Sequence, residues 1–199
     1  MTARIRLATI QDAKEILNIY RPYIKDTCIT FEYEVPSLEE FTQRIRDISR
    51  EYPYLVCEID GRVVGYAYAH RQLARAAYQW NAELSVYVDQ AYVGHKIGGA
   101  LYGALLEILA CQNVQNVYGL VTSPNPGSQR LHEKFGFGIM GVCKDTGYKN
   151  GKWHDVIWFE KKIGPHSAPP KPFEPVDGLA VSLIKRITES HEKIIKKQP

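Results

Sequence analysis

One unit in the middle of the chain, a strand that passes through a glycine turn into an apolar helix, most limits the fold. Residues 82–88 alternate between apolar side chains and polar or aromatic ones, which is the period of a β-strand with two different faces. The turn at residues 93–99 contains three glycines, and leucines and isoleucines then recur at helical spacing as far as residue 109. The unit therefore predicts a sheet with at least one helix packed against it.

Cap and turn signals on either side of this unit extend the prediction to a complete domain. Capping boxes predict the starts of two helices, and Asp-Gly and Asn-Gly pairs between apolar runs predict two hairpins. An Asn-Pro pair predicts the start of a further helix, which a glycine ends. In chain order these signals are Thr9 with Asp12, Ser37 with Glu40, Asp60-Gly61, Asn125-Pro126, Gly136 and Asn150-Gly151. The predicted order is β-αα-ββ-β-α-β-α-ββ, a mixed α/β sheet domain.

The chain divides into a domain at residues 1–163 and an appendage at residues 164–199, which differ in character. Five prolines near the start of the appendage exclude a regular helix or a central strand there and indicate a linker or a wrapping arm. The apolar stripe from Leu179 to Ile195 predicts a basic amphipathic helix. Such a helix can pack on its own domain, mediate dimer contacts or lie on an acidic membrane surface. Its few basic residues and the lack of Trp or Phe on its stripe favour the first two.

Composition and charge exclude several classes of protein. The chain is 45% apolar and 24% charged, which is normal for a soluble globular chain, and no apolar run is long enough to span a membrane. The N-terminus has no apolar signal-peptide segment and the four cysteines are scattered, so we expect a reduced, cytoplasmic protein. The net charge of +3 lies beyond residue 177, where five basic residues accompany two acidic ones, and the remaining body is neutral with 20 of each sign. We therefore expect no nucleic-acid or membrane partner, and no spacing typical of metal ligands occurs.

Several short motifs occur in a set order between Ile5 and Ile163. They are Thr30-Phe31-Glu32, Val64-Gly65-Tyr66-Ala67, Arg75 with Tyr78 and Trp80, Glu83 with Ser85-Val86-Tyr87-Val88, Asn125, Leu131-His132-Glu133, Gly136-Phe137, Gly147-Tyr148-Lys149 and Trp153-His154-Asp155-Val156. Over this stretch the chain resembles the GNAT superfamily of N-acetyltransferases, closest to its phosphinothricin and methionine sulfoximine acetyltransferase branch. The resemblance implies the α/β GNAT fold, a mixed and mostly antiparallel central sheet flanked by helices, here with a C-terminal Pro-rich arm and amphipathic helix.

The resemblance also implies an activity. Members of this branch transfer an acetyl group from acetyl-CoA to the primary amine of a small amino acid-like substrate, and they are typically homodimers. We expect direct attack by the amine in a ternary complex, since none of the four cysteines has the partners of a nucleophilic thiol. Two alternatives stay open: the acceptor is a peptide or protein N-terminus, or the chain is a non-catalytic acyl-CoA-binding module.

The glycine turn matches the family's pyrophosphate loop only in part. Relatives read (R/Q)-x-x-G-x-(G/A), whereas this chain has Val93 and Lys96 at two of the three key positions. Backbone N–H groups at a helix N-terminus bind anions whatever the side chains, so we expect binding to persist. Lys96 would carry backbone strain if its φ angle were positive. The resemblance assigns acetyl-CoA binding to Val86, Tyr87, Val88, Gly94, His95, Lys96, Ile97, Gly98, Gly99, Asn125 and Lys134.

Within this assignment, the backbone N–H groups of Val86 and Val88 hold the thioester carbonyl, and Asn125 contacts the pantetheine arm or the substrate. Glu83 is the candidate general base that takes a proton from the amine, directly or through one water. The alternative for Glu83 is a carboxylate paired with a nearby cation. His132 is either the general acid for the CoA thiolate, a substrate contact, or a packed helical residue.

An amino acid-like acceptor carries a carboxylate, for which a guanidinium is the natural bidentate partner. Arg75, in the loop before the Glu83 strand, is the candidate for this contact. Tyr78 and Phe31 are the candidate walls of the substrate pocket, with Trp80 beside them. The alternatives are a solvated loop charge for Arg75 and core packing for the aromatic residues.

Overall fold

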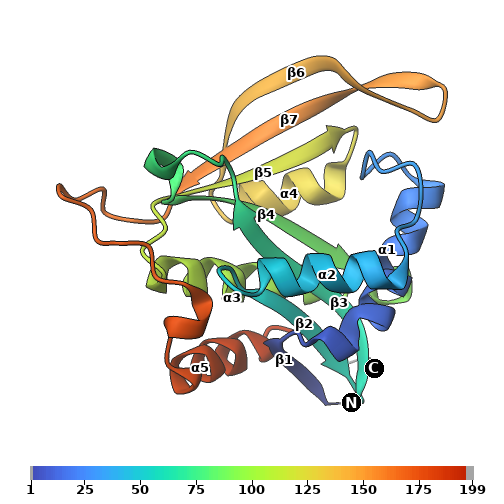
Figure 1. Cartoon of the computed structure of the whole chain (residues 1–199). Coiled ribbons are helices and arrows are strands. Elements are labelled where there is room, and N and C mark those ends of the chain that lie inside the picture. Colours follow the sequence, from blue (N-terminus) through green and yellow to red (C-terminus); the bar gives the residue numbers. More distant parts are fainter. Residues whose placement is uncertain (1, 196–199) are drawn as a thin grey trace.

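Residues 2–195 are described by the computed structural model, and they form one seven-stranded sheet with helices on both faces (Figure 1). The strands are β1 (Ala3–Leu7), β2 (Tyr54–Ile59), β3 (Arg62–Arg71), β4 (Asn81–Val88), β5 (Asn116–Ser123), β6 (Gly138–Lys149) and β7 (Lys152–Lys162). The α-helices are α1 (Ala13–Asp26), α2 (Leu38–Ile48), α3 (Ile97–Cys111), α4 (Pro126–Lys134) and α5 (Val181–Glu192). The strand order is β1-β2-β3-β4-β5-β7-β6, and all neighbours are antiparallel except β4 and β5. The mixed, mostly antiparallel sheet expected from the sequence is confirmed.

Two tight turns form where the sequence predicts them. Asp60 and Gly61 have φ angles of 49° and 83°, and Asn150 and Gly151 have φ angles of 51° and 79°. Positive φ at both central residues is the geometry of a type I′ turn, whose twist matches that of the flanking strands. These turns close the β2–β3 and β6–β7 hairpins.

Strand β4 lies at the centre of the sheet, between two hydrophobic clusters. Its even-numbered residues face α3, where a methyl group of Val88 lies 3.6 Å from the position that a Cβ would take at Gly98. Its odd-numbered residues face α1, where Tyr87 packs edge-on against Tyr20 and Tyr23 at centroid distances of 4.9 and 5.1 Å. The two faces predicted for this strand are therefore confirmed.

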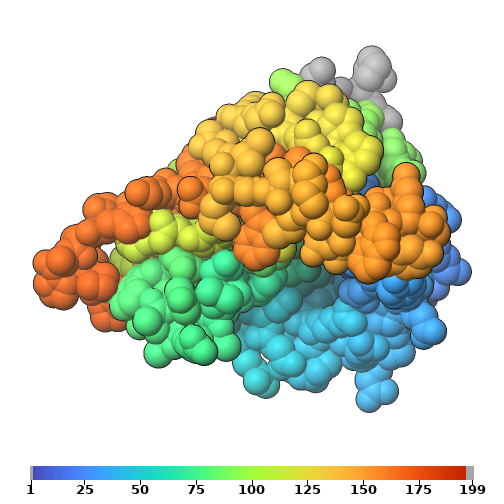
Figure 2. Space-filling model, turned by 90° about the horizontal axis from the view of Figure 1, so that it is seen from above, coloured from blue at the N-terminus to red at the C-terminus, as the bar shows by residue number. Residues whose placement is uncertain are grey.

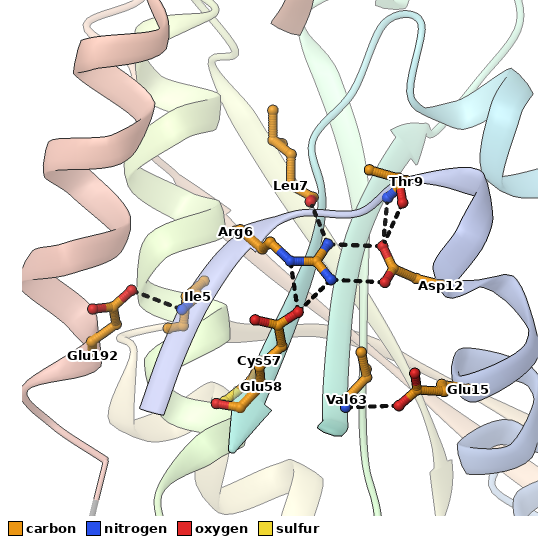
Figure 3. A network of polar contacts seen from close by, with 10 residues as sticks. All are labelled: Ile5, Arg6, Leu7, Thr9, Asp12, Glu15, Cys57, Glu58, Val63 and Glu192. Carbon is orange, nitrogen blue, oxygen red and sulfur yellow. Dashed lines mark hydrogen bonds and ion pairs between the residues drawn. The ribbon is translucent and has the colours of Figure 1, made fainter. Parts of the chain in front are cut away.

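Polar contacts join the edge strand β1 to its surroundings (Figure 3). The guanidinium of Arg6 donates to both carboxylate oxygens of Asp12 at 2.8 Å, and it also donates to Glu58 on β2. On the other edge of β1, the N–H of Ile5 donates to the carboxylate of Glu192 on α5 at 2.8 Å. The first strand is thus tied to β2, to the start of α1 and to the last helix.

The proline-rich arm and α5 pack on the domain that precedes them. The carbonyl of Lys171 in the arm accepts a hydrogen bond from the indole N–H of Trp80 at 2.7 Å. Ile184 and Ile187 of α5 are buried in the same hydrophobic cluster as the apolar face of α3. The sequence left three surfaces open for this helix, and in the structure it packs on its own domain. Residues 196–199 of the appendage lie outside the described part.

Replacing Ile187 by Ala is expected to destabilise the whole domain, because α5 contributes this side chain to the shared core. The expected loss is about 2–4 kcal/mol, which lowers Tm by several degrees in thermal unfolding followed by circular dichroism. Val181→Ala, at a position of the same helix that is 81% exposed, is the matched control and should change Tm by less than about 2 °C. An unchanged Tm for Ile187→Ala would show that the appendage adds nothing to the stability of the domain.

Candidate active site

Strands β4 and β5 pair for a short distance and then part. Residues 81–83 of β4 lie in parallel register with residues 116–118 of β5, and the pairing ends there. Both strands continue, β4 to Val88 and β5 to Ser123, so the sheet opens between them (Figure 1). The facing edges of two central strands are thereby free of strand pairing along most of their length.

The backbone of β4 presents N–H groups to this opening. The N–H of Asp89 donates to the carbonyl of Val64 on β3 at 2.8 Å, so the N–H groups of the odd-numbered residues of β4 face β3. Those of Val86 and Val88 therefore face the opening. The carbonyl of Val88 also faces it and accepts a hydrogen bond from the hydroxyl of Tyr23 at 2.6 Å, on the side where α1 approaches. An N–H donor of this kind suits a carbonyl oxygen that gains negative charge during a reaction, and the two donors, spaced two residues apart, suit two different carbonyl groups of a ligand.

The glycine turn joins the end of β4 to the N-terminus of α3. Lys96, the residue before α3, has a φ angle of 65° and a ψ angle of 11°, a left-handed conformation, and its side chain does not cap the helix. The first N–H groups of an α-helix have no partner within it, so those of Ile97, Gly98 and Gly99 are directed out of the helix end. A Cβ added at Gly94 or Gly99 would meet no atom within 4 Å, so there is open space beside the turn. Free N–H groups at a helix end beside open space are the features of an anion-binding site. The positive φ of Lys96 strains its backbone, because this residue has a Cβ.

Glu83 is the last residue of β4 that pairs with β5, so its side chain lies where the opening begins. The side chain is 22% exposed, and Nε2 of His70 on β3 lies 3.7 Å from its Oε1. Burial raises the pKa of the Glu83 carboxyl above its ordinary 4.5, and the proximity of His70 partly opposes the rise. The alternative partner considered for Glu83 is therefore present as a histidine, which is a cation only when its ring is protonated. Burial leaves Glu83 with a raised proton affinity, which is the property that a general base needs.

The loop after α1, which carries Phe31, is fastened to the β6–β7 hairpin. The ring of Phe31 lies against Gly147, where a Cβ would overlap it. The buried ammonium of Lys149 donates to the carbonyls of Ile24 and Thr30 at 2.7 Å each. In the sequence, Lys149 stands out only as part of a family motif. Its role in holding the loop has no local signal, because the two carbonyls are 125 and 119 residues away.

The other predicted acceptor residues lie on the loop between β3 and β4. Arg75 and Tyr78 are exposed there, and Arg75 makes no ion pair with any residue from 2 to 195. The indole N–H of Trp80 is taken by the carbonyl of Lys171 in the proline-rich arm. Seen from above, this loop (green) and the segment after α1 (blue) flank the β6–β7 hairpin (orange) from different sides (Figure 2).

Two predicted cofactor contacts lie at the ends of α4. Asn125 caps the helix, since its Oδ1 accepts from the N–H of Ser128 at 3.1 Å, as the Asn-Pro pair predicts. The side-chain NH2 of Asn125 is the group left to reach a ligand. Lys134 is exposed at the other end of α4.

His132 is packed between α4 and the sheet. It is 4% exposed, and its ring stacks on Phe159 at a centroid distance of 4.8 Å. Nδ1 donates to the carbonyl of Ser128 at 2.8 Å, and Nε2 accepts from the hydroxyl of Tyr102 at 2.9 Å. Burial lowers the pKa of the ring, which is therefore neutral, with its single N–H already bonded. This geometry favours the packed alternative for His132 over the general acid.

No three His, Cys, Asp or Glu side chains among residues 2–195 lie close enough to hold a metal ion. None of the helices in that range is long and apolar enough to cross a membrane. The four cysteines are free; Cys57 is buried, whereas Cys143 is exposed.

Replacing Lys96 by Gly is expected to stabilise the protein, because glycine adopts the left-handed conformation without steric strain. The expected gain is about 1 kcal/mol, or roughly 2–4 °C in Tm. His95→Gly is the matched control, since φ at this neighbouring position is not positive and glycine there should lower Tm. A lower Tm for Lys96→Gly would show that the lysine side chain stabilises the turn by more than its backbone strain costs.

Comparison with known proteins relates these features to named relatives. Phosphinothricin N-acetyltransferase of Streptomyces viridochromogenes is 36% identical over 172 residues, which cover 86% of this chain and 93% of the relative. L-methionine sulfoximine/L-methionine sulfone acetyltransferase of Pseudomonas paraeruginosa is 30% identical over 175 residues, which cover 85% of this chain and 100% of the relative.

A solved structure and a family model agree with these relatives. The crystal structure of a GNAT superfamily phosphinothricin acetyltransferase from Sinorhizobium meliloti, in complex with AcCoA, superposes with a TM-score of 0.82 at 34% identity. The superposition covers 87% of this chain and 95% of that one. The family model of the acetyltransferase (GNAT) domain matches residues 5–158, from the middle of β1 to the middle of β7. This chain therefore belongs to the GNAT family of acetyltransferases.

Proposed function

We propose that this chain transfers the acetyl group of acetyl-CoA to the primary amine of a small amino acid-like acceptor, of the phosphinothricin or methionine sulfoximine type. The observation that carries the proposal is the opening between β4 and β5, which begins at Glu83 and leads to the glycine turn with two backbone donors along its edge. The activities for which the relatives are named support the same assignment. The amine attacks the thioester directly while both substrates are bound.

The proposed path of acetyl-CoA follows β4 from the glycine turn towards Glu83. The pyrophosphate binds the N–H groups of residues 94–99, near the positive end of the α3 dipole and the ammonium of Lys96. The pantetheine arm lies in the opening, with the side-chain NH2 of Asn125 as a further donor. The N–H groups of Val86 and Val88 lie two residues apart on a regular strand, roughly 6.6 Å from each other, so each binds a different carbonyl. One donates to the thioester carbonyl and the other to a carbonyl of the pantetheine arm. A single donor of this kind contributes about 100- to 1,000-fold to the rate of acyl transfer.

The amine arrives protonated and must lose a proton before it attacks. Glu83 is the proposed base, because it lies at the inner end of the opening and its raised pKa favours proton uptake. Attack on the carbonyl carbon forms a tetrahedral intermediate, and its collapse breaks the C–S bond and releases the CoA thiolate. The attacking nitrogen loses its second proton as the amide forms, and the thiolate must gain one. The single N–H of His132 is bonded to Ser128, so we propose that water carries this proton from the nitrogen to the thiolate and that His132 keeps α4 packed on the sheet.

The acceptor is proposed to bind on the α1 and α2 side of the sheet, towards which Glu83 points. Arg75 is its proposed carboxylate partner, since this guanidinium has no ion pair within residues 2–195 and is free to bind in a bidentate way. Tyr78 and Phe31 are the proposed walls of the pocket. The contacts of Lys149 make the Phe31 wall rigid, which suits a small acceptor rather than a long peptide.

We also propose that the protein is a cytoplasmic homodimer. Apolar side chains are exposed on the edge strand β6 and on its neighbour β7, where a second copy would cover them. They are Ile139, Met140, Val142 and Trp153. Exposed apolar side chains on a sheet edge favour association, and the four free cysteines agree with a reducing compartment.

Release of CoA thiol from acetyl-CoA, followed with a thiol reagent, tests the reaction. The panel of amines contains phosphinothricin, methionine sulfoximine, methionine sulfone, the common amino acids and short peptides. We expect turnover with the small carboxylate-bearing amines. Glu83→Gln should lower kcat by about 100-fold or more, because the amine keeps its proton, while acetyl-CoA binding measured by calorimetry stays unchanged.

The other outcomes separate the alternatives. Turnover confined to peptides would assign the acceptor to a peptide or protein N-terminus. Binding of acetyl-CoA without thiol release from any amine would make the chain an acyl-CoA-binding module. An unchanged kcat in Glu83→Gln would remove Glu83 from the mechanism but leave the transfer itself standing.

Arg75→Ala is expected to raise KM for a carboxylate-bearing acceptor about 10- to 100-fold, because a hydrogen-bonded charge pair contributes about 1.5–3 kcal/mol. KM for acetyl-CoA should stay as in the wild type. The acceptor's carboxamide, which lacks the negative charge, is the control, and wild type and variant should use it equally poorly. An unchanged KM, or the same rise in KM for both acceptors, would show that Arg75 is a solvated loop residue that does not bind the carboxylate.

A further inference from the structure

His70 on β3 is next to the proposed base and has no role in the function described so far. The antiparallel register of β3 and β4 pairs His70 directly with Glu83, so the two side chains leave the sheet on the same face. Nε2 of His70 lies 3.7 Å from Oε1 of Glu83. The side chain of His70 is 37% exposed and that of Glu83 is 22% exposed, so the histidine is the member of the pair with more access to solvent.

The position of the proton on the neutral His70 ring follows from the hydrogen bond of Nδ1, the ring nitrogen that does not face Glu83. Nδ1 lies 3.1 Å from the carbonyl oxygen of Arg71. A carbonyl oxygen can only accept, so Nδ1 carries the proton in the neutral ring. Nε2 is then unprotonated and faces the carboxyl of Glu83. This is the arrangement in which a neutral histidine can take a proton from a protonated carboxyl.

We propose that His70 is a second proton carrier of the reaction, which takes from Glu83 the proton that Glu83 has removed from the amine and passes it to solvent. The inference rests on the proposed acetyl transfer with Glu83 as its base. A carboxyl in a partly buried place, covered further by two substrates, needs a path by which to lose its proton before the next turnover. His70 provides this path because it reaches from Glu83 to solvent.

Each step of the transfer balances. An N–H bond of the substrate ammonium breaks as an O–H bond forms on Glu83. That O–H bond breaks as an Nε2–H bond forms on His70, when side-chain rotation brings the two atoms from 3.7 Å to hydrogen-bond distance. The imidazolium of His70 then loses the proton to bulk water, and both side chains return to their starting forms.

The other charged or titratable groups near the pair do not compete for this proton. They are Tyr68 and Arg71 on β3, Tyr118 on β5, Glu51, and Glu32 and Arg44 from the α1 and α2 side. Burial raises the pKa of both tyrosines, so they stay protonated and neutral. The four remaining groups form two ion pairs, Arg44 with Glu32 at 2.7 Å and Arg71 with Glu51 at 3.2 Å.

Removal of the imidazole and its replacement from solution test this proposal. His70→Ala should lower kcat for the acetyl transfer about 10-fold or more, at the low end of what proton transfer by a side chain contributes, with KM for acetyl-CoA unchanged. Added imidazole should restore kcat in proportion to its concentration, because it fits the vacated space and carries the same proton. His70→Gln, which keeps the volume but not the basicity, should show the same loss without the response to imidazole. In His70→Gln, the acidic limb of the pH profile of kcat/KM should move to higher pH, because residue 70 no longer opposes the raised pKa of Glu83.

His166→Ala is the matched control, an exposed histidine on the arm that contacts Gly164 and Asn116. It should keep the wild-type kcat and show no response to imidazole. A wild-type kcat in His70→Ala, or a loss that imidazole does not restore, would overturn the relay and leave a purely structural pair. Absence of thiol release by the wild-type protein would instead reject the proposed acetyl transfer, and a fully active Glu83→Gln would reject Glu83 as the base, so the three failures are distinguishable.

Discussion

The separation of β4 from β5 after residue 83 is the constraint on which the rest of the site depends. A buried backbone N–H or C=O needs a hydrogen-bond partner, so a sheet that opens at its centre must meet the freed groups in another way. The hydroxyl of Tyr23 bonds the freed carbonyl of Val88, and the N–H groups of Val86 and Val88 are left facing the opening. A ligand with two carbonyl groups at a matching spacing would satisfy both donors. The opening is therefore the basis both of the shape of the proposed site and of its proposed chemistry.

Strand β4 and the turn after it carry the groups of the proposed reaction in order along the chain. The proposed base Glu83 lies where β4 and β5 part, the proposed N–H donors follow on the same strand, and the glycine turn with its proposed anion site comes directly after β4. Lys96 adopts the left-handed conformation of this turn, although that conformation strains any residue with a Cβ. This agrees with a site that is built from backbone groups rather than from side chains.

The acceptor side of the sheet is built differently, from aromatic side chains and long-range contacts. Tyr66 stacks between Tyr54 and Tyr87 at centroid distances of 5.9 and 5.2 Å, and Tyr68 extends this aromatic layer towards His70. Glu83 leaves the sheet on the same face as this layer, and burial raises its pKa. His70 partly offsets that effect, so in the proposed relay the pair combines a base of raised proton affinity with a route to solvent.

The sequence by itself determined the elements of this protein and their order. Type I′ turns at Asp-Gly and Asn-Gly, the cap at Asn125 and the alternation along β4 are local, because each depends on residues a few positions apart. The glycine turn and Glu83 were identified in the same way, with the help of a family resemblance. The roles of the site residues do not follow from local patterns in this way. The sequence around His132, for example, fits a general acid and a packed residue equally well.

Such alternatives depend on contacts between distant segments, which only the tertiary structure supplies. The ring of His132 is buried against Phe159 and Tyr102, which favours the packed residue, and the indole N–H of Trp80 bonds the arm. Lys149 joins the β6–β7 hairpin to carbonyls near the start of the chain. His70 gains its place beside Glu83 from the register of two strands, which no pattern along the chain specifies. Side-chain chemistry can be read from a sequence, but burial and pairing arise only when the chain has folded.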